Sequence, residues 1–144
     1  MDFVSQVQEE IYAKVDAWMK ELFGEMYSKS EEIPLFYLQM GSAVAHITVQ
    51  PWGDDECAVN SRCYVVREPD IVPELMHYLL RKNDTMRFGA FGLDKDDDIF
   101  FEHAIAGTSC TKADLRSSVL AVVLTADKLD DEIVSQWGGK RAAD

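Results

Sequence analysis

The 144-residue sequence has few cysteines, no long apolar run and no leader-like first residues. Three cysteines are an odd number and too few for a disulfide scaffold, so we expect a protein of the reducing cytoplasm. No apolar run approaches the roughly 20 residues that cross a bilayer, and the first residues lack the basic start and apolar core of a signal peptide. We expect one domain over residues 1–144, with an ordered core from about 3 to 138.

Positive charge is also scarce, with 14 Lys and Arg against 26 Asp and Glu and a formal net charge of −12. A field of this sign repels the phosphates of nucleic acids and the headgroups of anionic lipids. We therefore expect neither a nucleic-acid partner nor a membrane partner. The charge does not name a partner, because solubility alone is an equally good reason for it.

Metal-binding motifs are absent as well. The acidic segment 94–98 resembles a calcium loop only in its alternating aspartates, because the sixth and twelfth positions hold Ile99 and Ile105 where that loop needs Gly and Glu. It indicates the tip of a hairpin instead. Cys57 and Cys63 do not have the ligand spacing of a structural zinc site, and their shared parity on a strand points both inward.

The sequence also lacks catalytic and phosphate-binding motifs. Cys110 and His103 could be read as nucleophile and base, but the sequence shows no orienting third group and no oxyanion hole. Gly89 and Gly92 match neither a dinucleotide fingerprint nor a P-loop, and within a strand they indicate a bulge or a close backbone approach. We therefore expect no catalytic residue, no cofactor and no metal.

What the sequence does contain is a clear change of hydrophobic period. Apolar residues three and four apart predict helices over 4–23, 70–83 and 111–137. Alternating or dense β-forming runs predict strands over 33–40, 43–49, 57–65, 86–93 and 99–105. The order α-β-β-β-α-β-β-α predicts an α+β fold, in which a twisted antiparallel sheet of five strands packs with three helices on one face or end.

Local signals mark the helix ends. Gly24 ends the first helix, and Asp70 is expected to cap the second. Thr111 and Asp114 form a capping box for the last helix, which ends at the pair Gly138-Gly139. The residues after that pair, 140–144, are expected to fray.

Both faces of part of the sheet are expected to be apolar. An antiparallel sheet with one hydrated face does not have this pattern, so the second face is expected to be covered within the monomer, by a dimer mate or by a peptide. Trp52 adds a large apolar group at a turn. The residues expected to bind a partner are Trp52, Phe91 and Phe100; the strand residues expected on the second face are Val44, Phe91 and Phe100, opposite Ile47, Phe88 and Phe101.

A family resemblance rests on the segment from the second helix to the last. Leu79-Leu80-Arg81-Lys82-Asn83 leads into Met86-Arg87-Phe88-Gly89-Ala90-Phe91-Gly92-Leu93-Asp94, and Asp98-Ile99-Phe100-Phe101-Glu102 then runs to the long final helix. This pattern resembles the YbjN family, which groups with the CesT-like type III secretion chaperones. The resemblance implies the same element order, a bacterial homodimer and a small acidic protein that holds a non-globular segment of a client polypeptide.

Three functions follow from these observations. The favoured one is a non-enzymatic chaperone-like or adaptor protein that binds an extended peptide by strand-edge pairing and apolar grooves. The alternative is a sensory or stress-response regulator that acts by contact with a folded partner. A small-ligand sensor or an enzyme, with a pocket between sheet and helices, is least favoured.

Overall fold

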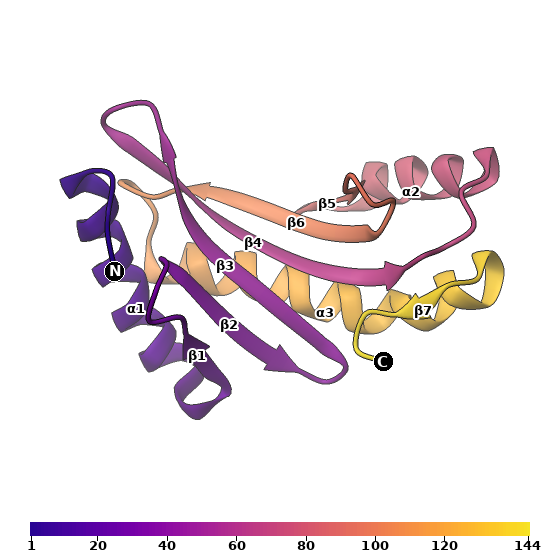
Figure 1. The fold of residues 1–144 in the computed structure, drawn as a ribbon, viewed down its shortest axis with the longest axis horizontal. Coiled ribbons are helices and arrows are strands. Elements are labelled where there is room, and N and C mark those ends of the chain that lie inside the picture. Colours follow the sequence, from indigo (N-terminus) through magenta and orange to yellow (C-terminus); the bar gives the residue numbers. More distant parts are fainter.

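The chain folds into a seven-stranded antiparallel sheet and three α-helices (Figure 1). The segments with a helical hydrophobic period form the helices, and the alternating segments form the longer strands. The computed structural model describes all 144 residues. The elements in chain order are α1 (Gln6–Phe23), the short 3-10 helix η1 (Gly24–Met26), β1 (Tyr27–Lys29), β2 (Leu35–Met40), β3 (Ala43–Trp52), β4 (Glu56–Arg67), α2 (Pro73–Thr85), β5 (Ala90–Leu93), β6 (Ile99–Ala106), α3 (Lys112–Trp137) and β7 (Lys140–Arg141).

The predicted α+β class and its five longer strands are confirmed, and the strand count is corrected to seven. The two additional strands, β1 and β7, have three and two residues and are therefore too short to show alternation in the sequence. The strand order is β1-β2-β3-β4-β6-β5, and β7 pairs with the end of β4. Residues 140–141 are thus paired rather than frayed.

The helices divide the sheet into a covered face and an open one. Helices α1 and α3 lie behind the sheet in Figure 1 and contact β3 and β4, while α2 lies beside the edge strand β5. Between α1, α3 and the sheet lies a core of 27 buried residues, including Phe36 and Phe101. Cys57 and Cys63 both lie in this core, as their parity predicts.

Capping follows the sequence at two helices and departs from it at the third. The Thr111 side chain accepts a hydrogen bond from the Asp114 amide, the Asp114 carboxylate accepts from the Thr111 amide, and the predicted capping box is therefore confirmed. Gly24 ends α1 with a φ of 55°. The expectation that Asp70 caps α2 is wrong: Val72 occupies that position without a side-chain hydrogen bond, and Pro73 supplies the first turn.

The predicted close backbone approach at Gly89 and Gly92, in the fourth expected strand, is confirmed. A Cβ atom on Gly89 would lie 2.5 Å from the Phe101 ring, and one on Gly92 would lie 2.5 Å from the Phe100 ring. Gly89 has a φ of 107°, which extended backbone does not adopt. The strand expected over 86–93 consequently begins only at Ala90.

Candidate peptide-binding surfaces

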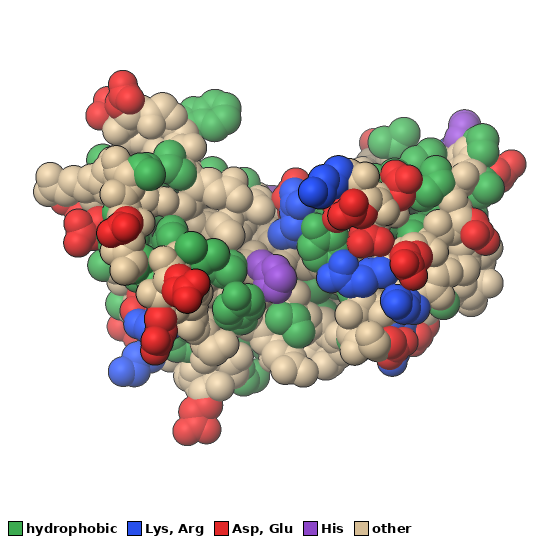
Figure 2. Space-filling model, in the orientation of Figure 1, with side chains coloured by type: hydrophobic (Ala, Val, Ile, Leu, Met, Phe, Trp, Pro, Cys, Tyr) green, Lys and Arg blue, Asp and Glu red, His purple; other side chains and the backbone are tan.

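The sheet face that α1 and α3 leave uncovered, here the open face, carries mixed polar and apolar side chains. Figure 2 shows it from the front, with hydrophobic side chains and one histidine towards the centre and a cluster of basic and acidic side chains beside them. The strand alternation assigns to this face Leu35, Tyr37, Val44, His46, Thr48, Asn60, Arg62, Tyr64, Phe100 and Glu102.

Phe100 lies on the open face as predicted, but it is only 8% exposed. The Arg62 guanidinium stacks on its ring at 3.7 Å and is itself held by the Glu102 carboxylate at 2.9 Å. Tyr64 packs edge-on against the same ring. The expectation that Phe100 presents a bare apolar surface is therefore corrected, because a cation–π contact from the neighbouring strand covers it.

Phe91 does not lie on the open face. It pairs in register with Phe101, whose ring it meets edge-on at 4.9 Å, so both point towards the covered face. Phe91 is 7% exposed. Phe88, expected opposite Phe91 in the core, is instead exposed, because the strand starts after Gly89 and the alternation expected over 86–93 does not apply there.

Trp52 is the exposed member of the predicted set. It ends β3 at the turn of the β3–β4 hairpin and is 73% exposed. Beside it lies a shallow hollow of about 300 Å³ whose lining includes the small residues Ala58, Ala104 and Ala106. This hairpin extends past the helices at the end of the molecule where α1 lies (Figure 1).

The three positions where the sheet could accept another strand differ in availability. At β5, the Phe91 amide donates to the Asn83 side-chain oxygen at 2.7 Å, and the Asn83 side-chain nitrogen donates to the Phe91 carbonyl at 3.2 Å. At the end of β4, β7 occupies the ladder. Strand β1 lies at one edge of the sheet and pairs on one side only, with β2. Its outer edge is the available one.

A groove of about 470 Å³ lies between α1 and β1, and we call it the α1–β1 groove. Its aromatic wall is continuous with the core, since Phe3 packs on Tyr12 at 5.3 Å and Tyr12 stacks on Phe36 at 4.8 Å. Its lining is Met1, Phe3, Glu9, Tyr12, Ala13, Asp16, Ala17, Lys20, Tyr27 and Lys29. Sequence reasoning missed this groove, although the pair Ala13 and Ala17, four residues apart on α1, is the signal of a helix face that leaves room for another chain.

Three polar side chains of the α1–β1 groove bind one another. The Asp16 carboxylate accepts hydrogen bonds from the Tyr27 hydroxyl and the Lys29 ammonium, both at 2.7 Å. Burial alone would raise the pKa of Asp16, but these two hydrogen bonds and the positive charges of Lys29 and Lys20 together hold that pKa below its usual range. The Asp16 carboxylate and the Lys29 ammonium are thus paired, and the aromatic side chains of Phe3 and Tyr12 line the groove beside them.

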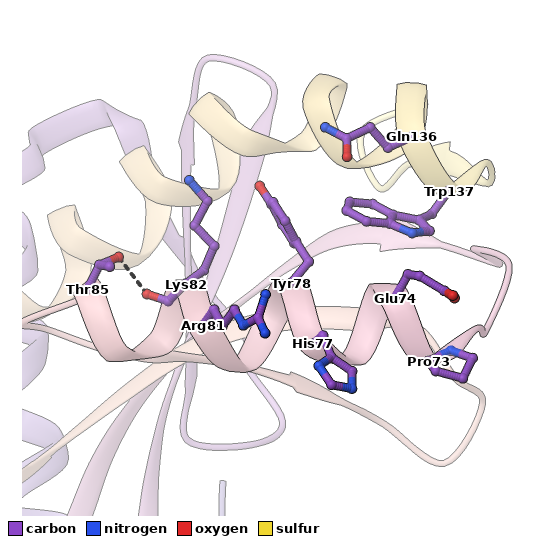
Figure 3. A pocket seen from close by; sticks show the side chains of 9 residues that line it. All are labelled: Pro73, Glu74, His77, Tyr78, Arg81, Lys82, Thr85, Gln136 and Trp137. Atoms are coloured by element: carbon purple, nitrogen blue, oxygen red, sulfur yellow. Dashed lines mark hydrogen bonds between the residues drawn. The ribbon is translucent and has the colours of Figure 1, made fainter.

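A second, larger groove of about 710 Å³ lies between α2 and the end of α3 (Figure 3). Figure 3 shows Tyr78 and Trp137 between the two helices, and their ring centroids are 4.7 Å apart. The Lys82 ammonium lies 5.5 Å from the Tyr78 ring. Burial and the nearby Glu132 carboxylate raise the pKa of Tyr78 to about 12, so its hydroxyl stays protonated. This groove combines an aromatic floor with a cationic rim.

The pair weighed for nucleophilic chemistry is not arranged for it. His103 is hydrogen-bonded through Nδ1 to the Ser118 hydroxyl at 2.8 Å, and burial lowers its pKa. The Cys110 thiol donates to the Gly107 carbonyl at 3.5 Å, and burial raises the pKa of that thiol. Both shifts favour the neutral forms, which disfavours a thiolate–imidazolium pair. No cluster of three or more His, Cys, Asp or Glu is placed to hold a metal ion, and none of the helices is long and apolar enough to span a bilayer.

Comparison with known proteins agrees with this geometry. No curated protein matches the chain. Among solved structures, the Yersinia pestis type III secretion chaperone SycH, in complex with a stable fragment of YscM2, has the same fold, with a TM-score of 0.61 at 16% sequence identity. The match covers 83% of this chain and 98% of that one. The family described as T3SS (YopN, CesT) and YbjN peptide-binding chaperone 1 matches residues 9–144. The chain therefore belongs to this family of peptide-binding chaperones, as the segment from Leu79 to Glu102 indicates.

Proposed function

We propose that this protein is a non-enzymatic chaperone-like protein that holds an extended segment of a partner polypeptide along β1 and in the α1–β1 groove. The observation that carries this proposal is the unpaired outer edge of β1 beside an aromatic groove. Strand addition supplies main-chain hydrogen bonds, and the groove selects alternate side chains of the added strand. Family membership supports the same class of function.

The size of the groove sets how much of the affinity it supplies. A groove of about 470 Å³ has room for one or two large apolar side chains. Each side chain transferred from water contributes about 1.5–3 kcal/mol. Ordering a disordered segment costs about 2–5 kcal/mol, so the groove contacts and the strand pairing together have to exceed that cost. We therefore propose that clients carry apolar residues at alternate positions.

Of the residues predicted from sequence to bind a partner, Trp52 is carried into this proposal. Its exposed ring lies on the hairpin at the α1 end of the molecule, so a segment leaving the α1–β1 groove can reach it as a second anchor (Figure 1). Phe91 and Phe100 are covered in the isolated chain and lie on β5 and β6, away from β1, so they are proposed to stabilise the sheet and not to contact the partner.

We further propose that the protein is cytoplasmic, because its three cysteines are free. We also propose that it is a homodimer, formed through the exposed side of α2. Leu80 is 69% exposed on α2, and Glu74 and Arg81 lie two turns apart on that helix, without an ion pair of their own. Two antiparallel copies of α2 related by a two-fold axis place Glu74 of each copy near the Arg81 of its mate. Wild-type protein is expected to sediment as a dimer at tens of micromolar, and Leu80→Glu as a monomer.

The peptide site is tested with paired substitutions of the same chemistry. Ala17→Gln places a larger side chain in the groove, and glutamine is a good helix former, so α1 is kept. The control, Ala113→Gln, places the same side chain on the exposed start of α3. Both variants are screened against an array of extended host peptides. Ala17→Gln is expected to lose the peptides that wild type and Ala113→Gln retain.

Strand addition is tested on the captured peptide. N-methylation at every second residue removes the amide donors on one edge of the peptide only. One of the two methylated registers is expected to lose binding and the other to keep it. Equal capture by Ala17→Gln and Ala113→Gln, or equal binding of the two registers, would show that the groove or the strand pairing is wrongly assigned.

A further inference from the structure

The end of β4 next to β7 is a second place where the sheet accepts a strand. The ladder between β3 and β4 stops at the pair Ala45 and Cys63, although β4 continues to Arg67. On the same side, β7 pairs with Val66 and Arg67, and the Ala142 amide donates to the Val65 carbonyl at 3.1 Å. The C-terminal residues thus fill a gap in the sheet that β3 leaves open.

Two glycines allow the chain to reach this gap. Gly138 and Gly139 have φ values of 72° and 79°, which turn the chain back after α3. A Cβ atom on Gly139 would lie 2.5 Å from the Arg67 carbonyl oxygen, so only glycine lets the backbone approach β4 so closely. The docking of β7 is therefore specified by the sequence.

The contacts that hold β7 are few and exposed. Lys140 meets Glu68 at 3.7 Å and Arg141 meets Asp131 at 3.7 Å, and these carboxylates are 78% and 80% exposed. Ion pairs so open to water contribute little. Beneath the segment, Ala142 and Ala143 leave a cavity of about 70 Å³ against the open face, also lined by Val44, His46 and Tyr64. Two alanines are too small to fill it.

We propose that this gap at Val65–Arg67 binds an extended peptide strand with one medium-sized aliphatic side chain, and that β7 occupies it in the free protein. The peptide would make the main-chain hydrogen bonds that β7 makes now, and its aliphatic side chain would fill the cavity that Ala142 leaves. This site lies apart from the α1–β1 groove, so it adds a second strand-binding position to the proposed function and does not depend on the first.

The test uses full-length protein and a defined probe, the peptide copying residues 139–144 with the change A142V. Gly139→Ala displaces β7 by its clash with Arg67, and Ala142→Pro displaces it by removing the amide that bonds to Val65. The control is Gly53→Ala, which also has a positive φ (65°) but no atom within 4 Å of the new Cβ. Amide chemical shifts of labelled protein report both the site and the apparent Kd.

The probe is expected to shift the amides of Val65–Arg67. If β7 is docked about nine-tenths of the time, both displaced variants bind the probe about tenfold more tightly than wild type and Gly53→Ala do. In wild type the Ala142 amide is expected to be protected from hydrogen exchange. Equal affinity in all four proteins, an unprotected Ala142 amide, or shifts confined to Tyr27–Lys29 would overturn the inference; the last result would leave the β1 site intact.

Discussion

Replacing Asn83 by alanine tests how the β5 edge is closed. The Asn83 side chain makes two hydrogen bonds with the Phe91 backbone, at 2.7 and 3.2 Å, and so acts as a one-residue strand at the end of α2. Each such bond contributes about 0.5–1.5 kcal/mol net. Water reaches the half-buried site and can partly replace the lost partner. Asn83→Ala is therefore expected to lower the free energy of unfolding by about 2 kcal/mol, within the 1–3 kcal/mol that two bonds allow.

The assay is urea unfolding followed by circular dichroism at fixed protein concentration, because a dimer would make the midpoint concentration-dependent. With a slope near 2 kcal/mol/M, a 2 kcal/mol loss moves the midpoint by about 1 M. The control is Thr85→Ala at the same helix end, which removes an exposed hydrogen bond at 2.7 Å from the Thr85 hydroxyl to the Lys82 carbonyl. It is expected to cost less than about 0.5 kcal/mol, as surface changes usually do. Equal midpoints for the two variants would refute the assignment.

Three further results are expected. Burial lowers the pKa of His103, and burial together with Arg67 lowers that of His46, so the unfolded chain binds more protons. Stability is therefore kept above about pH 6.5 and lost below it, which lowers the urea midpoint at pH 5.5 relative to pH 7.5 and does so less in His103→Gln. Phe101→Ala, at a fully buried ring, is expected to cost about 3–5 kcal/mol in the same urea assay. Arg62→Ala is expected to uncover Phe100 and raise the fluorescence of a bound apolar dye, and unchanged fluorescence would contradict the shielding role.

The longer elements were predictable because each is specified by its own residues. The helix period of α3, its capping box and its terminal glycines all lie within one segment of sequence. The inward parity of Cys57 and Cys63 likewise follows from alternation alone. The two short strands were not predictable, since their positions are set by neighbours distant in the chain: β1 by β2, and β7 by the end of β4.

The candidate site was predicted only in part, because side-chain shielding depends on register. Phe100 and Arg62 are 38 positions apart in the chain, and only the β4–β6 pairing brings the guanidinium over the ring. The error at Phe91 arose within one segment, where the positive φ of Gly89 interrupts the expected alternation. The α1–β1 groove brings Tyr12 of α1 and Tyr27 of β1 together; the pair Ala13 and Ala17 marks the helix side of the groove, but no local pattern indicates which strand lies opposite.

The arrangement of the sheet edges indicates where recognition takes place. Exposed edge strands invite unwanted pairing, and proteins usually close or shorten them. Here Asn83 closes β5 and β7 closes the end of β4, whereas β1 is left open but limited to three residues. An edge of three residues offers few main-chain hydrogen bonds. A partner without suitable side chains therefore gains little binding free energy from pairing with it. Discrimination between partners must then come from the aromatic wall of the α1–β1 groove, which explains why an open edge need not make the protein aggregate.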